Sequence, residues 1–391
     1  MSRMNRRRFL IAGAGAGAAG LLSGAVAVEW PDLMRAAVDR PLAENSGVLV
    51  IVTLYGGNDG INTLIPYADN AYHDARPELA YDPGDVLHLD GQLGLNPALR
   101  GLAGLWRRRR LAIVRGVGYP HPDRSHFRSM DIWQTASPAE PVATGWIGRW
   151  LDATGDDPLR AVNIGPVLPP LAVGEKRTAA ALSPGHAAGM RDFGPVMEAL
   201  GADDPGDTPA MAAVCRAYRA AHTAEKSFAS VKPAGRGHNP LAEQLHTVAG
   251  AVRARVPTRV YTVQLGGFDT HADERGTQQR LLRTLDEAVT GFLSDMADRN
   301  VVVLAYSEFG RRVRANASHG TDHGTAGPVF VAGAQVRGGF YGAEPSLTDL
   351  DHGDLKFTTD FRDVYFELLS RTVGTDPTPA VGAGRTALGF L

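Results

Sequence analysis

The 391-residue sequence has little cysteine and no marked excess of either charge. Its one cysteine, Cys215, excludes an internal disulfide. The 40 basic and 42 acidic residues give a net charge of −2, and no basic face stands out, so nothing indicates nucleic-acid binding. A basic run at residues 106–110 closes an expected helix, where the helix dipole alone favours positive charge.

Long apolar stretches are also scarce, and the N-terminal one follows a pair of arginines. Arg6 and Arg7 precede Phe9, and an uncharged stretch rich in glycine and alanine runs on to Val28. This order is typical of a secretory signal and resembles its twin-arginine form. We therefore predict a signal peptide over residues 1–27, cleavage near Ala27, a periplasmic or extracellular location, and no stable membrane span after cleavage. A retained membrane anchor is the alternative.

Short apolar, β-branched runs alternate with helical patterns along the remaining chain. Such runs are typical of strands that are buried on both faces of a sheet. Strands are expected at residues 47–55, 111–117, 161–164, 259–265, 301–306 and 329–332, and helices at residues 97–106, 278–297 and 361–373. The alternation predicts an α/β fold, a three-layer sandwich around a largely parallel sheet. We expect one domain over residues 28–391, with residues 185–256 as a possible helical insertion.

Three of the expected strands end in acidic residues. Asp59, Asp269 and Glu308 each follow a strand, the first two in glycine-rich segments. The carboxyl ends of parallel strands meet at one edge of a sheet, where open α/β sheets bind ligands. Clustered carboxylates repel one another, so a divalent cation is their natural partner.

Two further loops carry other chemical groups. One loop, residues 121–128, contains Ser125, His126 and Arg128, and the other, residues 318–325, contains His323. Nitrogen ligands mixed with carboxylates favour Zn, Mn or Fe. Each side chain also has a structural interpretation, such as an Asx turn for Asp59 or a helix cap for Ser125.

Several short motifs together carry a family resemblance. They lie at residues 54–62, 125–127, 145–149, 267–271, 307–311 and 322–326. In combination they resemble the exported domain-of-unknown-function family 1501, which is similar to the alkaline phosphatase/sulfatase superfamily. The resemblance covers nearly all of the chain after the signal and implies an alkaline-phosphatase-like fold.

The superfamily resemblance also implies a site for one or two divalent metal ions. The residues that match its ligands are Asp59, Asp269, His271, Glu308 and His323, and the matching nucleophile is Ser125. Three departures stand out. The spacing of Asp269 and His271 is tighter than in well-known members of the superfamily. Phe309 follows Glu308 where an Asp-His pair is expected. His323 precedes its strand, so it reaches the carboxyl edge only if that strand is antiparallel or if the loop at residues 311–325 folds back.

These observations predict an exported metal-dependent hydrolase of phosphate or sulfate esters, with a small-molecule ester as substrate and the twin-arginine machinery as export partner. Ser125 would attack the ester, Arg128 or Arg124 would hold its oxygens, and Asn58 would donate to the same group. A non-catalytic binding or assembly protein of the cell envelope is the alternative, because of Phe309. A dinucleotide-dependent oxidoreductase is disfavoured, because residues 56–60 lack the Gly-x-Gly-x-x-Gly fingerprint.

Overall fold

The computed structural model of the protein describes residues 26–165, 167–182 and 239–391. The chain divides into two compact units: Met1–Glu44, Gln134–His238 and Gly250–Tyr261 form the first, and Asn45–Trp133, Asn239–Ala249 and Thr262–Leu391 form the second. Nearly all of the expected signal peptide, and residues 185–238 of the expected insertion, lie outside the described residues. The rest of that segment contains helix α9 (Pro240–Arg253).

The described part of the first unit contains a short parallel sheet and two helices. Strand β8 (Ala180–Leu182) pairs in parallel with both β1 (Val26–Ala27) and β7 (Ala161–Ile164). The helices are α2 (Trp30–Asp39) and α6 (Trp146–Thr154). Trp146 and Trp150 of α6 are fully buried and provide much of the apolar surface of this helix.

The second unit contains the sheet that positions the candidate site. Its strand order is β9-β2-β10-β11-β6-β12, with β15 also paired to β6. The strands are β2 (Val48–Leu54), β6 (Leu111–Gly118), β9 (Val260–Leu265), β10 (Val301–Ser307), β11 (Gly327–Gly333), β12 (Gly339–Tyr341) and β15 (Thr359–Asp360). β2 is parallel to β10, and β6 is parallel to β12 and β15, whereas β11 is antiparallel to both β10 and β6. The mostly parallel sheet confirms the predicted fold class.

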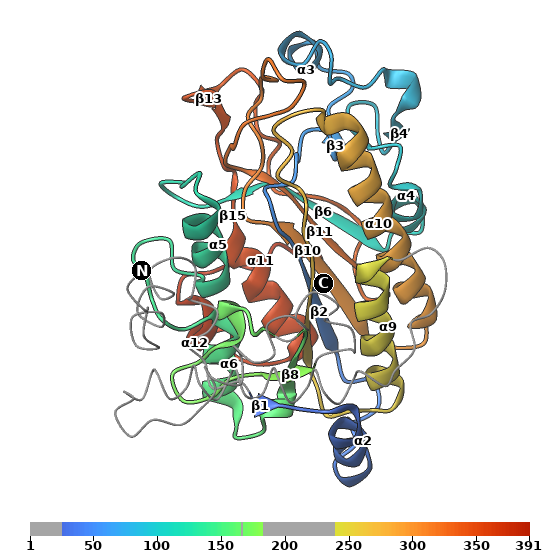
Figure 1. The fold of residues 1–391 in the computed structure, drawn as a ribbon, viewed down its shortest axis with the longest axis vertical. Helices are drawn as coiled ribbons and strands as arrows, with labels where there is room; N and C mark the ends of the chain where they lie inside the picture. The colour runs from blue at the N-terminus through green and yellow to red at the C-terminus, as the bar shows by residue number, and fades with distance from the viewer. Residues whose placement is uncertain (1–25, 166, 183–238) are drawn as a thin grey trace, which may run out of the picture. The chain divides into compact units, whose positions relative to one another are not determined.

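Helices cover this sheet on both sides (Figure 1). Helices α4 (Arg100–Arg107) and α10 (Glu274–Asp295) lie on one side and contact each other, and Asp286 of α10 accepts hydrogen bonds from the backbone of Gly101 and Leu102. Helices α5 (His126–Thr135) and α11 (Phe361–Glu367) lie on the other side, where Trp133 stacks on Tyr306. The π-helical residues Leu368–Val373 and the short helix α12 (Thr378–Val381) follow α11.

Burial on both faces explains the continuous apolar runs seen in the sequence. Every residue of β2 is buried, and so is every residue of β10 except its last, Ser307. A strand with helices above and below must be apolar at successive positions, not at alternate ones. Burial on both faces therefore explains why these strands could be predicted from the sequence.

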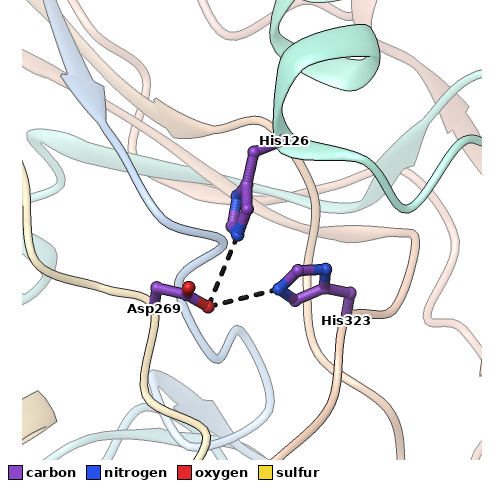
Figure 2. A group of neighbouring side chains, drawn as sticks. All are labelled: His126, Asp269 and His323. Atoms are coloured by element: carbon purple, nitrogen blue, oxygen red, sulfur yellow. Dashed lines mark hydrogen bonds and ion pairs between the residues drawn. The ribbon is translucent and has the colours of Figure 1, made fainter.

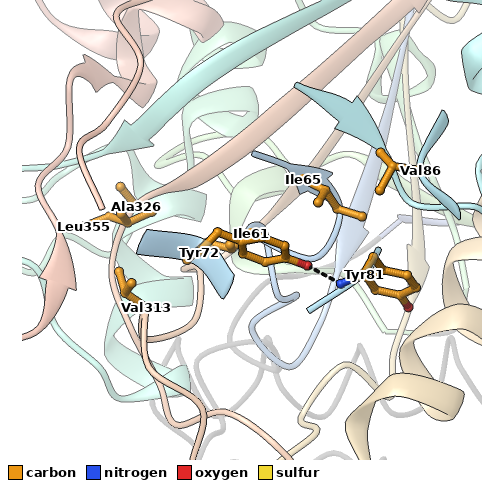
Figure 3. Packing of buried hydrophobic residues seen from close by; sticks show 8 residues of the cluster. All are labelled: Ile61, Ile65, Tyr72, Tyr81, Val86, Val313, Ala326 and Leu355. Carbon is orange, nitrogen blue, oxygen red and sulfur yellow. Dashed lines mark hydrogen bonds between the residues drawn. The ribbon is translucent and has the colours of Figure 1, made fainter. Parts of the chain in front are cut away.

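Short elements surround the carboxyl edge of the sheet. Strands β3 (Leu64–Ile65), β4 (Leu87–His88) and β5 (Gly94–Leu95) form an antiparallel sheet, β13 (Leu350–Asp351) pairs with β14 (Asp354–Leu355), and α3 spans Asn70–Ala75. A buried cluster that includes Ile61, Tyr72 and Tyr81 packs beneath them, and the Tyr72 hydroxyl accepts a hydrogen bond from the Tyr81 amide (Figure 3). Within the described part of the chain, no helix combines the length and apolar content needed to cross a bilayer.

Candidate metal centre

The topology brings four chain segments to one edge of the second unit's sheet. β2 and β10 run in parallel and end there, and the backbone of Tyr55, just after β2, hydrogen-bonds to Leu265 and Phe268 at the end of β9. β11 runs in the opposite direction, so the residues before it lie at the same edge. His323 thereby reaches the edge, and an isolated bridge between Arg311 and His323 also folds the loop back. The strand after His323 is thus antiparallel and the loop before that strand folds back, which are the two ways in which His323 was expected to reach this edge.

Three imidazoles converge on one carboxylate oxygen. Asp269 Oδ1 lies 3.0 Å from His271 Nε2, 3.2 Å from His323 Nε2 and 3.4 Å from His126 Nε2. Figure 2 shows the rings of His126 and His323 directed at this oxygen from two different segments. His271 Nε2 also lies 2.9 Å from His323 Nε2. Donor atoms of His126, Asp269 and His323 are close enough to hold one metal ion.

Hydrogen bonds on the far side of two rings set the tautomers that a metal needs. His126 Nδ1 lies 2.8 Å from Glu308 Oε1, and His323 Nδ1 lies 2.8 Å from the Arg124 carbonyl oxygen. Both partners are acceptors, so each Nδ1 carries the proton. A neutral ring then presents an Nε2 lone pair to the cluster, as metal-binding histidines do. His126 Nε2 is buried without a hydrogen-bond partner in the described chain, so these residues fit a bound cation.

Glu308 orients His126 and does not face the cluster. Its buried carboxylate accepts hydrogen bonds from the Gly56 amide at 2.9 Å and from the Ser307 hydroxyl at 2.9 Å, in addition to His126. The hydrogen bond to Glu308 raises the pKa of His126. Burial, by contrast, lowers the pKa of His323. The two rings therefore differ in basicity although both point at Asp269.

Arg311 ties the strand ends together and keeps Asp269 ionised. Its buried guanidinium donates to the carbonyls of Gly57, Phe268 and Thr321, and to Asp269 Oδ1 at 2.9 Å. Partial burial disfavours the charge on Asp269, but the hydrogen bond from Arg311 lowers the pKa of this carboxyl to about 2. The carboxylate is therefore charged at neutral pH and available to a cation.

The glycine-rich turn after β2 makes this close assembly possible. Gly56 has a φ of +117°, and a Cβ at this position would lie 2.4 Å from the Asp269 amide nitrogen. A Cβ on Gly57 would lie 2.2 Å from the Phe309 ring. Only glycine allows the turn to approach these segments, so the motif is needed for packing of the site.

Asp59 lies at the same edge but outside the imidazole cluster. Both of its carboxylate oxygens are bonded to the buried guanidinium of Arg76. Burial opposes the charge of Asp59, but the ion pair with Arg76 holds the pKa of this carboxyl below its ordinary value. The structure thus places this predicted ligand in a separate buried ion pair.

Three further predicted residues lie around the cluster without joining it. Ser125 is exposed, its carbonyl accepts the Ser129 amide at the start of α5, and its side chain makes no hydrogen bond to the described residues. Arg128 pairs with Asp131 at 2.5 Å on the same helix. The buried side-chain amide of Asn58 donates to the Thr63 hydroxyl.

His126 is the cluster residue that sequence reasoning did not assign. It lies in the Ser-His-Phe motif, next to Ser125, the residue predicted as the nucleophile. In the structure the His126 ring lies 4.9 Å from the Phe309 ring between centroids, and the His323 ring is equally close to Phe309. The imidazole that Phe309 lacks is therefore supplied next to it by helix α5.

The fold and the cluster together define a mixed α/β protein with a histidine- and aspartate-lined candidate metal centre. Residues 211–377 match the sequence profile of the family described as "Protein of unknown function (DUF1501)". This match confirms the family resemblance for the segment that contains the last three motifs, at residues 267–271, 307–311 and 322–326. No significant match was found among curated proteins.

Several solved structures are similar to this chain at low sequence identity. A structure titled "Ps i-CgsB" shares 8% identity with a TM-score of 0.44, covering 87% of this chain and 75% of the other. A Vibrio parahaemolyticus protein in the alkaline phosphatase superfamily shares 11% identity with a TM-score of 0.41 over 90% and 76%. The zinc complex of the C-terminal periplasmic domain of EcEptC from Escherichia coli shares 10% identity with a TM-score of 0.36 over 74% and 76%.

Proposed function

We propose that the protein is a metal-dependent hydrolase of phosphate or sulfate esters. The observation that carries the proposal is the convergence of three Nε2 atoms on Asp269 Oδ1, with His126 Nε2 buried and without a hydrogen-bond partner in the described chain. Three imidazole nitrogens have little reason to converge on one carboxylate oxygen unless a cation joins them.

His126, Asp269 and His323 would hold the cation, with His271 as a fourth ligand. A donor set of nitrogens with one carboxylate suits zinc or manganese. Such an ion supplies Lewis-acid chemistry, stabilising negative charge on ester oxygens. Glu308 would keep the His126 ring in place, and the Asp322 carboxylate, 3.6 Å from His271 Nδ1, would do the same for His271.

A pocket beside the cluster would receive the organic part of the ester. Its volume is about 340 Å³, at the lower end of the range for small-molecule sites. Phe309 forms part of its wall and also contacts His126 and His323, so the pocket and the cluster share one side chain. Tyr119, Leu355 and Phe357 add further apolar or aromatic side chains to the lining, which also includes the charged residues Asp123, Asp351 and Lys356. This arrangement favours an ester whose alcohol portion carries an apolar or aromatic face.

Ser125 is the candidate nucleophile of this site. Its hydroxyl is exposed and has no hydrogen-bond partner among the described residues, and the next residue, His126, belongs to the cluster. Attack would form a bond from Ser125 Oγ to phosphorus or sulfur and release the alcohol. Water would then cleave the serine ester and free phosphate or sulfate.

Replacement of Ser125 by alanine tests this proposal. Hydrolysis of p-nitrophenyl phosphate and p-nitrophenyl sulfate would be followed in the metal-loaded wild type, in Ser125→Ala and in Ser294→Ala. We expect Ser125→Ala to lower turnover at least about a hundredfold, as loss of a nucleophile does. The helix-cap contribution of a serine is on the order of 1 kcal/mol, so the fold should survive.

Ser294 is exposed on α10 and far along the helix from the cluster, so Ser294→Ala should keep full turnover. Full turnover in Ser125→Ala would remove the serine from the chemistry and favour attack by water. Absence of hydrolysis in a wild type that retains its metal would reject the hydrolase and support the alternative, a non-catalytic binding protein.

A further inference from the structure

A second charged feature of the same unit lies outside the metal centre. A groove of about 710 Å³ runs between helix α4 and the first turns of helix α10. Its polar lining residues include Arg100, Arg107, Arg275, Gln279, Tyr81 and Asp85. Three of these carry positive charge and one carries negative charge, so the groove as a whole favours anions.

The arginines of the groove are not neutralised by the described protein. Arg100 and Arg107 make no ion pair or hydrogen bond with the described residues. The Arg275 guanidinium lies 4.3 Å from the centre of the Tyr81 ring and reaches only the Ala80 carbonyl, at 3.5 Å. Stacking holds this guanidinium flat while leaving donors for a ligand.

Helix electrostatics explain one of these arginines but not the other. Arg107 ends α4, where the helix dipole favours a cation, whereas Arg100 begins α4, where the dipole disfavours one. A positive charge at the N-terminal end of a helix is unfavourable, and a bound anion would offset it.

Tyr81 adds a buried polar group to the groove. The residue is only 1% exposed, and its hydroxyl has no hydrogen bond of ordinary geometry, although it faces the side chains of Asn96 and Gln279. Figure 3 shows the hydroxyl directed away from the other labelled side chains of the apolar cluster. A buried O–H without a partner is costly, and an oxyanion in the groove would satisfy it.

The spacing of the arginines sets the kind of anion. Arg100 and Arg107 are seven residues apart on α4, which corresponds to about 10 Å along a helix. This separation lets a ligand with two anionic groups contact both guanidinium groups at once. We propose that the groove binds a polyanion that carries at least two phosphate or sulfate groups about 10 Å apart, independently of the metal centre.

Binding of defined polyanions by the full chain tests the proposal. Linear polyphosphate and a sulfated oligosaccharide would be titrated calorimetrically at low salt, with inorganic phosphate as the single-group probe. We expect the wild type to bind at least one polymer about tenfold or more tightly than inorganic phosphate. Arg100→Gln with Arg107→Gln should lose at least about tenfold in affinity and show a weaker salt dependence. Tighter binding of polyphosphate would indicate a phosphate-bearing ligand, and tighter binding of the sulfated oligosaccharide would indicate a sulfate-bearing one.

A matched control removes the same charge outside the groove. Arg108 and Arg110 are exposed, follow α4 and do not line the groove, so Arg108→Gln with Arg110→Gln should change affinity less than about twofold. Equal losses in the two double variants, or no binding by the wild type, would overturn the proposal. Polyanion binding should also persist in Asp269→Ala after treatment with a chelator. The groove proposal can therefore hold even if the hydrolase proposal fails. Loss of binding there would assign the anion to the metal centre.

Discussion

Beside the candidate metal centre lies a buried group of ionisable side chains whose positive and negative charges must nearly cancel. Arg76 and Asp59 pair with both side chains buried, and Glu274 lies next to them and accepts a hydrogen bond from the Thr321 hydroxyl at 2.6 Å. Burial and the nearby Asp59 raise the pKa of Glu274 to about 9. Glu274 is therefore protonated at neutral pH, and the group as a whole is close to neutral.

This proton makes stability depend on pH in a definite direction. Glu274 ionises near its ordinary pKa of 4.5 in the unfolded chain but only near 9 in the folded protein, so unfolding releases a proton between these values. The free energy of unfolding should then fall as the pH rises through this window. Glu274→Gln should remove this fall. The free energy of unfolding of the variant, relative to that of the wild type, should therefore be higher at pH 8 than at pH 5 by at least about 1 kcal/mol.

Thermal unfolding of the wild type and the variant at both pH values measures the effect. Glu287→Gln is the control, because Glu287 is exposed on the same helix. The same pH dependence in wild type and Glu274→Gln would show that Glu274 is ionised in the folded protein.

The same network shows which site residues a sequence can and cannot reveal. Asp269, His271 and His323 were predicted as ligands and meet in one cluster, because motifs at strand ends report directly on the sheet edge. Glu308 was also predicted as a ligand, but it orients His126. The partner of Asp59 is Arg76, which lies in no motif, so its ion pair could not be seen in the sequence.

At the scale of elements, strand existence was predictable and strand direction was not. The apolar run at residues 161–164 has the same bounds as β7. The run at residues 47–55 extends one residue beyond β2 at each end, and the run at residues 301–306 ends one residue before β10 does. The antiparallel direction of β11 depends on pairings with β10 and β6, which no local pattern encodes. Two-residue strands such as β3 and β13 depend wholly on tertiary pairing and left no periodic signal.

The arrangement of the strands also explains why Arg311 can connect several segments at the carboxyl edge of the sheet. Arg311 follows β10 and bonds to carbonyls in the segments after β2 and β9 and to the loop before β11. Three independent segments are thus fixed to one guanidinium, whose planar fork suits several acceptors at once. The cluster is positioned by the sheet through this residue.

At the scale of the whole molecule, we predict that the protein leaves the cytoplasm by the twin-arginine route. Arg6 and Arg7 precede an uncharged apolar stretch that ends near Ala27. Arg6→Lys with Arg7→Lys should block export because the export receptor reads the arginine pair, while the protein still folds and accumulates in the cytoplasm. Cell fractionation and immunoblotting measure the distribution. Unchanged export of the double variant would favour an ordinary secretory signal or a membrane anchor.

The central claim is that the imidazole cluster binds a transition metal. The direct measurement is the metal content of the purified full chain by mass spectrometry after growth with zinc and manganese, in wild type, Asp269→Ala and Asp298→Asn. Asp269 contacts all three imidazoles, whereas Asp298 is exposed and, among the described residues, pairs only with Arg299. We expect about one ion per chain in the wild type and the Asp298 variant, and less than about a tenth of that in Asp269→Ala. A wild type without metal, or an Asp269→Ala protein that keeps its full content, would contradict the account.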